Sequence, residues 1–288
     1  MAHPLESLIQ KYSPKTALDY ENALKEIIQE ITLAGLARGN FFDKAAFYGG
    51  TALRIFYGLP RFSEDLDFTL LQSQPDFKLE PYFKYVQQSL ESFGFESEIV
   101  AVEKTENRKV ESAFLKANTQ VHLLKISSAQ PMAAQVQSNR VISVKIEVDV
   151  TAPLNFETEV KVLPPPITAS VKTLTSSSLF AGKMHAVLFR QWKTRIKGRD
   201  FYDLLWYLGQ GIPVKLSYLE TKMKDTHVLA DYEILTQAML IDLLEKRINS
   251  IDWKNAKKDV VNFLRDPSEV DAWSQDLFLA AIKSLKVF

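Results

Sequence analysis

Apolar residues recur along the chain at two different periods. Between residues 17 and 37 they are spaced by three and four positions, the period of a helix, and residues 81–93 follow the same pattern. Apolar and polar residues alternate over residues 66–71 and 141–151, which is typical of strands with one buried face. Further strands are predicted over residues 45–48, 95–103 and 119–127.

The second half of the chain contains only helical patterns. They cover residues 178–195, 199–209, 232–250, 253–264 and 270–285. The segment Pro164-Pro165-Pro166 precedes them, and three consecutive prolines form a stiff connector that neither a helix nor a central strand can include. We therefore predict an α+β fold, with a mixed-sheet N-terminal lobe over residues 1–163 and an all-α C-terminal lobe over residues 167–288.

The composition is that of a globular protein and excludes several kinds of site. Of 288 residues, 46% are hydrophobic and 24% charged, and 35 Lys and Arg balance 35 Asp and Glu. This balance excludes a protein that coats nucleic acid through bulk charge. The absence of cysteine excludes disulfides, thiolate metal sites and a cysteine nucleophile. No apolar stretch approaches the roughly 18 residues of a membrane helix and no signal-peptide pattern is present, so we expect a soluble, cytoplasmic protein.

Positive charge is concentrated near the triple proline. No acidic residue occurs between Glu159 and Asp200. The eight basic residues in this stretch are Lys161, Lys172, Lys183, Arg190, Lys193, Arg195, Lys197 and Arg199. Such a segment indicates either an anionic partner or a solvated surface whose acids come from elsewhere in the fold.

The segment Gly49-Gly50-Thr51 separates a predicted strand from a predicted helix. Glycine allows a tight turn and the close approach of a ligand, and the N–H groups that begin a helix suit a phosphate. A strand-to-helix turn also needs glycine for its geometry alone, and the Gly-Lys-Ser/Thr of a Walker loop is missing. The turn is therefore a candidate phosphate site only in combination with other motifs.

Asp65 and Asp67 are spaced by two residues at the start of a predicted strand, so they share one face while Leu66 and Phe68 face the core. Two carboxylates roughly 7 Å apart along a strand repel each other unless a cation lies between them. Mg²⁺ suits this position because it takes carboxylate and phosphate oxygens. The alternative is a polar outer face on an edge strand.

A second strand pattern carries Lys145, Glu147 and Asp149 on one face and valine and isoleucine on the other. If this strand pairs beside the first, it supplies a third carboxylate, which is enough for two metal ions about 4 Å apart. The pattern does not choose between Glu147 and Asp149. An amphipathic strand that faces water would show the same alternation.

The segment Lys197-Gly198-Arg199-Asp200 opens a helix with an apolar stripe, and Asp203 shares its first turn with Asp200. The helix dipole favours a carboxylate in the first turn, which is sufficient to explain either acid alone. Lys183, near the start of the preceding helix, is a candidate for a cation that reaches a triphosphate. The alternative is an ordinary surface lysine.

Taken in order, these motifs resemble those of the nucleotidyltransferase superfamily, Gly-[Gly/Ser]-[Ser/Thr] followed by Asp-x-Asp. Thirteen residues separate Thr51 from Asp65 here. Gly-Gly-Thr-Ala-Leu, Arg-x-Ser-x-Asp-Leu-Asp-Phe and Lys-x-Arg-Asp-x-x-Asp-Leu more narrowly resemble the AbiEii-type toxins, which include the MenT enzymes. The resemblance covers residues 40–71 and 141–209. It implies a polymerase-β-like fold and a toxin of a type IV-like toxin–antitoxin system.

The resemblance also implies roles for individual residues. The residues that would contact the nucleotide are Gly49, Gly50, Thr51, Arg61 and Ser63. The metal would be bound by Asp65, Asp67 and Glu147, and the triphosphate by Lys183. Either Asp200 or Asp203 would be the essential acid of the Arg-Asp block. The basic residues Arg190, Lys193, Arg195, Lys197 and Arg199 would contact the acceptor.

The implied reaction uses NTP and Mg²⁺, releases pyrophosphate and adds nucleotides to an RNA acceptor, the 3′ end of tRNA in the MenT group, which would block translation. The implied partner is a cognate antitoxin. Three alternatives remain open: the same fold with a protein or small-molecule acceptor, a silent interaction module, and a metal-dependent nuclease. The basic stretch argues against a small-molecule acceptor, and a silent module has no reason to keep carboxylates that repel each other.

Overall fold

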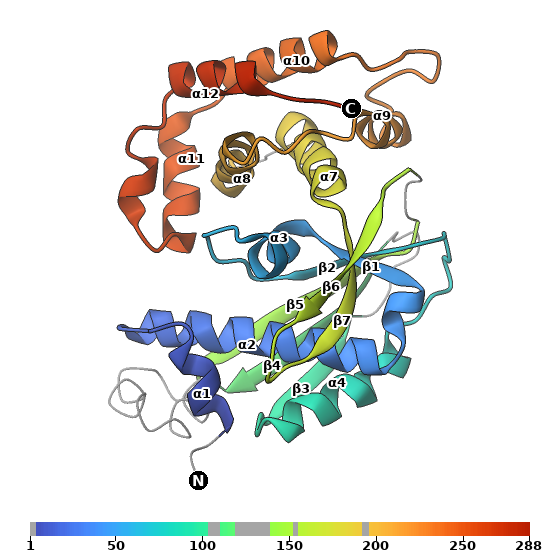
Figure 1. Ribbon diagram of the computed structural model, residues 1–288, viewed down its shortest axis with the longest axis vertical. Helices are drawn as coiled ribbons and strands as arrows, with labels where there is room; N and C mark the ends of the chain where they lie inside the picture. Colours follow the sequence, from blue (N-terminus) through green and yellow to red (C-terminus); the bar gives the residue numbers. More distant parts are fainter. Residues whose placement is uncertain (1–3, 103–109, 119–138, 152–154, 192–195) are drawn as a thin grey trace. The chain divides into compact units, whose positions relative to one another are not determined.

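The computed structural model describes residues 4–102, 110–118, 139–151, 155–191 and 196–288 (Figure 1). The strands are β1 (Ala45–Tyr48), β2 (Leu66–Leu70), β3 (Ser97–Ala101), β4 (Val110–Asn118), β5 (Val141–Asp149), β6 (Thr158–Leu163) and β7 (Ala169–Leu174). The α-helices are α1 (Pro4–Gln10), α2 (Ala17–Arg38), α3 (Gly49–Tyr57), α4 (Glu80–Ser92), α7 (Ser176–Phe189), α8 (Gly198–Gly209), α9 (Leu216–Asp225), α10 (Gln237–Asn249), α11 (Trp253–Val260) and α12 (Gln275–Ala281). Short 3₁₀ helices are η1 (Phe41–Asp43), η3 (Val261–Phe263), η4 (Pro267–Val270) and η5 (Ile282–Ser284).

The chain divides into two compact units that are discontinuous in sequence. Unit 1 comprises Met1–Tyr48, Glu64–Ala152 and Val160–Thr173, and unit 2 comprises Gly49–Ser63, Pro153–Glu159 and Leu174–Phe288. The two units therefore do not coincide with the two predicted lobes, residues 1–163 and 167–288. The triple proline connects β6 to β7, which are neighbours in one sheet. A run of prolines stiffens a connector without specifying what it connects.

The strands form a seven-stranded mixed sheet in the order β3-β4-β5-β2-β1-β7-β6. The pairs β1–β2, β3–β4 and β4–β5 are antiparallel, whereas β2–β5 and β1–β7 are parallel. This arrangement confirms the predicted α+β class. Antiparallel neighbours such as β4 and β5 need no crossover helix, so a mixed sheet forms with few helices.

One face of the sheet in unit 1 is covered by helices. Helix α2, which begins at a capping box formed by Thr16 and Asp19, packs on β5 and on α4 (Figure 1). The alternating positions Leu66 and Phe68 of β2 are fully buried, and Phe41 packs edge-on against Phe68 at 5.0 Å between ring centroids. The polar positions of β2 and β5 therefore occupy the opposite face.

Unit 2 is mainly helical. Thr175 caps α7 by accepting a hydrogen bond from the Ser178 backbone N–H. The stacked rings of Phe180 and Tyr207, 4.2 Å apart, join α7 to α8. The C-terminal segment returns to α9, where the Val214 N–H donates to the carbonyl of Lys286 (Figure 1).

Several element boundaries differ from the sequence predictions. Strands β4, β6 and β7 and helix α9 were not predicted, and the predicted strand 119–127 lies outside the described residues. Helix α7 ends at Phe189, and Arg190 is already extended. The edge strand β6 exposes both Val160 and Val162, so its alternating apolar positions do not face the core. Within the described residues, no helix has both the length and the apolar character that crossing a membrane requires.

Candidate active site

Asp67 and Glu147 are neighbours across two adjacent strands of unit 1. Strands β2 and β5 run parallel, with Asp67 opposite Glu147 and Thr69 opposite Asp149. Residues that pair in this way project from the same face, and neighbouring strands are about 4.8 Å apart. The register therefore brings together two of the three acids that the sequence predicts. Asp65 lies two residues before Asp67, immediately before β2.

The same register separates the two candidates for the third acid. Glu147 forms an ion pair with Lys145, 2.5 Å between Nζ and Oε1. Asp149 accepts hydrogen bonds from the Thr151 backbone N–H at 2.9 Å and from its hydroxyl at 3.2 Å. Asp149 is therefore engaged by its own turn and lies two residues further along the strand, opposite Thr69, whereas Glu147 is beside Asp67.

The donor set on this face suits a hard cation. Mg²⁺ is usually held by one or two carboxylates together with phosphate and water oxygens, rather than by a complete protein cage. Within the described ranges, no three His, Asp or Glu side chains gather as a ready metal cluster. The Lys145 ammonium group now occupies Glu147, so a bound cation would have to take its place at that carboxylate. The residues present therefore fit an ion that a substrate helps to coordinate.

The Gly-Gly-Thr turn belongs to unit 2 and opens helix α3. Gly49 has a positive φ of 83°, which glycine adopts without strain. A Cβ atom at Gly50 would lie 2.7 Å from Arg61 Nη2 and 3.0 Å from Ser63 Oγ. Any larger residue at this position would therefore collide with two side chains. Thr51 is fully buried, backbone included, so neither its hydroxyl nor its N–H is exposed in this structure.

Five charged residues of unit 2 form a largely buried ionic network. Arg61 binds Asp203 with two hydrogen bonds, Nε to Oδ1 at 2.6 Å and Nη2 to Oδ2 at 2.7 Å. Lys183 Nζ lies 2.8 Å from Asp203 Oδ2 and 2.7 Å from Asp200 Oδ1. Arg190 Nη1 binds the other oxygen of Asp200 at 2.8 Å. Three cations thus surround two carboxylates, which leaves one net positive charge.

Burial and pairing act in opposite directions on the groups of this network. Burial by itself would raise the pKa of Asp203, but Arg61 and Lys183 hold that pKa below its usual value. Burial would likewise lower the pKa of Lys183, but Asp200 and Asp203 raise it. Arg61, Lys183 and Asp203 therefore stay charged at neutral pH, and each depends on its partners to do so.

The network changes the interpretation of several predicted site residues. Lys183 does not extend alone into solvent, because it lies between two carboxylates. Arg61 is only 3% exposed and faces Asp203, and Asp203 itself is fully buried. The sequence shows that Asp200 and Asp203 share a helix face, but Arg61 is 142 positions away from its partner. Local patterns carry no signal for such a pair.

The basic residues between Glu159 and Asp200 do not lie together on one element. Lys161 and Lys172 lie in β6 and β7, whereas Lys197 and Arg199 lie at the start of α8. Lys183 and Arg190 are engaged by Asp200. Lys193 and Arg195 fall outside the described residues. Among the described residues, the acids that balance the stretch thus come from the helix that follows it.

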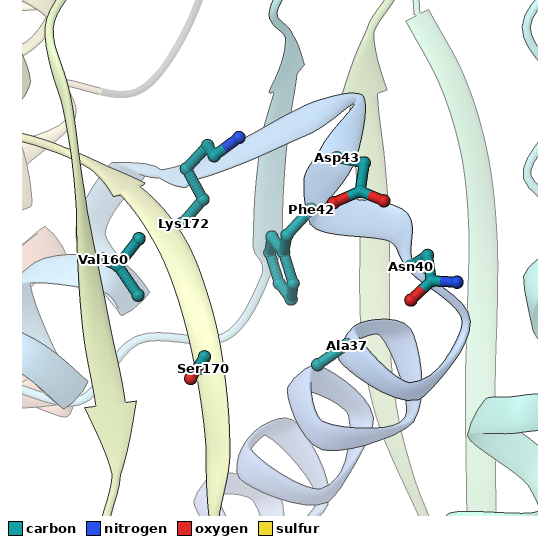
Figure 2. Close-up of a pocket in the computed structure, with 7 residues that line it drawn as sticks. All are labelled: Ala37, Asn40, Phe42, Asp43, Val160, Ser170 and Lys172. Carbon is teal, nitrogen blue, oxygen red and sulfur yellow. The ribbon is translucent and has the colours of Figure 1, made fainter.

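A pocket of about 210 Å³ lies in unit 1, away from the predicted site residues (Figure 2). Its lining consists of Ala37, Asn40, Phe42, Asp43, Val160, Ser170 and Lys172. Figure 2 shows Lys172 and Asp43 on opposite sides of the Phe42 ring. None of the acids, glycines or network residues described above lines it, so this pocket is not the candidate active site.

The sequence model of the AbiEii nucleotidyltransferase toxins, of the type IV toxin–antitoxin system, matches residues 31–281. The chain belongs to the AbiEii family. It is therefore a nucleotidyltransferase toxin, and the family implies an antitoxin as partner and NTP as substrate. This assignment confirms the resemblance found in the Gly-Gly-Thr and Asp-x-Asp motifs.

The fold of this AbiEii toxin is similar to that of JHP933 from Helicobacter pylori, with a TM-score of 0.50 and 18% identity over 91% of this chain and 90% of that chain. A second H. pylori structure, of a protein provisionally named a nucleotidyltransferase, has a TM-score of 0.48 and 18% identity over 90% and 92% of the two chains. No curated protein matches the chain.

Proposed function

We propose that this AbiEii toxin uses Mg²⁺ to transfer nucleotides from NTP to an RNA acceptor, the 3′ end of tRNA, and so blocks translation. The observation that carries the proposal is the register of β2 and β5, which pairs Asp67 with Glu147. Two carboxylates on one face of a sheet are costly to keep together unless a cation is bound there during function.

In this proposal Asp65, Asp67 and Glu147 hold the metal. The bound ion would offset the negative charge of the phosphates and lower the pKa of the attacking hydroxyl group. The backbone N–H groups that begin α3, together with Ser63, would contact the phosphates of the nucleotide. Gly50 supports this role because its lack of a Cβ lets the Arg61 and Ser63 side chains lie directly against the start of α3.

The ionic network would act by charge and by position. Its net positive charge would stabilise the charge that spreads over the phosphates as pyrophosphate leaves. Asp200 and Asp203 would hold Lys183 and Arg61 in place, because paired guanidinium and ammonium groups lose little further freedom when the substrate binds. Both acids are therefore positioning residues in this proposal, and Lys183 is the residue that contacts the triphosphate.

The RNA acceptor is supported by the two basic residues at the start of α8. Lys197 and Arg199 flank Gly198, whose missing Cβ allows α8 to approach the carbonyl of Ala256. A polyanionic acceptor benefits from such residues, whereas a small-molecule acceptor does not need them. A protein or small-molecule acceptor for the same chemistry remains the second candidate.

The test is the transfer of label to tRNA. Purified toxin is incubated with total tRNA, Mg²⁺ and each α-³²P-labelled NTP in turn, with Asp67→Ala as the inactive control and a chelator as the metal-free control. We expect label on tRNA from one or two NTPs, and none with either control. Label on protein or on small molecules instead would keep the transferase and refute the RNA acceptor.

A second measurement separates a transferase from a silent module. Because a ligand stabilises the state that binds it, Mg²⁺ and NTP should raise the melting temperature of the wild-type protein. Asp67→Asn should abolish or strongly reduce that shift. Neither a shift nor incorporation into any acceptor would contradict the proposed activity.

A further inference from the structure

Three arginines and two phenylalanines gather in unit 2, and we refer to them as the arginine–phenylalanine cluster. The guanidinium groups of Arg54 and Arg265 lie 5.1 and 5.7 Å from the centroid of the Phe62 ring. The guanidinium group of Arg199 lies 4.0 Å from the centroid of the Phe263 ring. The Phe62 backbone N–H donates to the Phe263 carbonyl at 2.8 Å, which joins the two halves of the cluster.

The backbone of Phe62 is fixed from both sides. Its N–H is bound by Phe263, and its carbonyl accepts a hydrogen bond from Arg61 Nη1 at 2.8 Å. Arg61 is itself held by the buried carboxylate of Asp203. The Phe62 side chain is nevertheless half-buried rather than buried. The ring is thus positioned before any ligand arrives, which lowers the entropy cost of binding.

Two arginines of the cluster differ in their surroundings: Arg54 is bound to the protein backbone, whereas Arg265 is exposed to solvent. Arg54 donates to the carbonyls of Leu59 and Pro60 at 3.1 and 2.8 Å, so it supports the turn that precedes Phe62. Arg265 is exposed. The acid next to it, Asp266, is engaged by the backbone N–H and the hydroxyl of Ser268 at 2.9 and 2.7 Å. The guanidinium group of Arg265 is therefore suited to an external anion.

Aromatic rings interleaved with guanidinium groups are the chemistry that recognises single-stranded RNA. Unpaired bases stack on aromatic rings and on guanidinium planes, and the positive charge attracts the phosphates between them. A small apolar ligand would not need three arginines, and a duplex keeps its bases stacked on one another. The cluster therefore fits an unpaired RNA end better than either.

The cluster is also close to the candidate metal site along the chain. Phe62 precedes Asp65 by three residues, so covalent geometry limits the distance between their Cα atoms to about 11 Å. This is the length of about three stacked nucleotides at about 3.4 Å each. A base held at Phe62 would therefore lie within a few nucleotides of a reacting 3′ hydroxyl.

We infer that the arginine–phenylalanine cluster binds the single-stranded 3′ end of the RNA acceptor, with bases stacked on its rings and Arg265 at a phosphate. The inference rests on the proposed transfer to RNA and names the residues that select this acceptor. It assigns a role to Phe62, an unspecified position of the Arg-x-Ser-x-Asp-Leu-Asp-Phe motif, and to Arg265, which lies outside all the motifs.

The test measures binding of a 5′-fluorescein-labelled single-stranded RNA of about 12 nucleotides by anisotropy, at several salt concentrations. Phe62→Leu should weaken binding about tenfold because it removes the stacking surface. Arg265→Gln should weaken it about threefold and lower the slope of log affinity against log salt by about 0.7, the value for one lost phosphate contact. Phe62→Tyr keeps a ring and should bind like the wild type.

Two matched controls are available in the same unit. Phe288 is an exposed phenylalanine whose ring also lies beneath a cation, Lys215 at 5.3 Å, so Phe288→Leu removes a comparable pair elsewhere. Lys283→Gln removes an exposed positive charge from η5. Both should bind RNA like the wild type. The melting-temperature shift with Mg²⁺ and NTP should be unchanged in all five variants, because the cluster contacts the acceptor and not the nucleotide.

The outcomes separate this inference from the proposed function. If the wild type labels tRNA but Phe62→Leu and Arg265→Gln bind RNA as tightly as the wild type, the inference is wrong and the proposed function stands. Equal losses in Phe62→Leu and Phe62→Tyr would also refute it, because stacking should tolerate tyrosine. If the wild type neither binds nor labels RNA and labels another acceptor, both fail.

Discussion

The acids of unit 1 and those of unit 2 belong to the same residue types but have opposite surroundings. On the sheet of unit 1, Asp67 lies beside Glu147, a like charge, and the Glu147 side chain is 31% exposed. In unit 2, Asp203 is fully buried and is bound by Arg61 and Lys183. The first pair places two half-exposed like charges side by side, with one lysine bound to Glu147, whereas Asp203 is enclosed by two buried cations.

This difference indicates how the two sets contribute to function. A carboxylate pair with unfavourable mutual repulsion gains free energy when it binds a cation, so it can serve a metal that arrives with the substrate. A buried carboxylate with two bound cations is already satisfied and is costly to disturb. We therefore expect the first set to matter for activity alone and the second for stability as well.

The largest effect is expected for Asp203→Ala. The substitution leaves Arg61 and Lys183 buried without their partner, which should lower the free energy of unfolding by about 3–5 kcal/mol. Urea unfolding measures the loss. Asp242→Ala, which breaks the exposed pair with Lys246, is the control and should cost less than about 0.5 kcal/mol. Similar small losses in both variants would remove the contrast between buried and exposed pairs.

Asp67→Asn should separate activity from stability. We expect the rate of nucleotide transfer to fall at least about a hundredfold, because the lost charge acts directly on the phosphates. The melting temperature without metal should change little, since Asp67 is only half-buried and lies beside the carboxylate of Glu147. Initial rates with labelled NTP and thermal melting are the measurements.

Two further variants test the register argument on the same strand. Glu147→Gln should lose activity as Asp67→Asn does, whereas Asp149→Asn, two residues further along, should retain most of it. A loss in Asp149→Asn equal to that in Glu147→Gln would show that the register does not select the third acid.

The stability of unit 2 should depend on pH through Asp203. Because Arg61 and Lys183 keep the pKa of Asp203 below its usual value of 3.8, this group stabilises the fold fully above that pH. The contribution is lost as the pH falls below about 4, at no more than about 1.4 kcal/mol per pH unit for one proton. Urea unfolding between pH 3 and 7 checks the expectation, and in Asp203→Asn the acid limb should be flatter.

The smallest effect is expected at His185, whose pKa is lowered to about 4 by burial and, to a lesser extent, by Lys222 and Arg190. Arg190→Gln removes one of these charges and should raise the pKa of His185 by less than about one pH unit, because burial remains. NMR titration of the ring protons measures the change. A rise to about 6.5 would show that the neighbouring positive charge, rather than burial, lowers the pKa of His185.

Local sequence patterns were sufficient for the elements that carry the site. The alternation of β2 and β5, the position of the Gly-Gly-Thr turn before α3 and the first turn of α8 all follow from periodicity and helix-start preferences. The order of these motifs was also sufficient to predict the family that residues 31–281 match. The extra strands β4, β6 and β7 were not predicted; β4 buries the charged Glu111 and β6 exposes Val160 and Val162, so side-chain polarity does not mark their buried faces.

Tertiary structure alone decided which of these residues meet. The register of β2 on β5 places Glu147, and not Asp149, beside Asp67, and a shift along the strand would change that choice without changing the pattern. The pairing of Arg61 with Asp203 joins residues 142 positions apart, and it changes Lys183 from an apparent surface lysine into part of a buried network. Periodicity is a property of neighbours in sequence, whereas register and ion pairing depend on how distant segments close against each other.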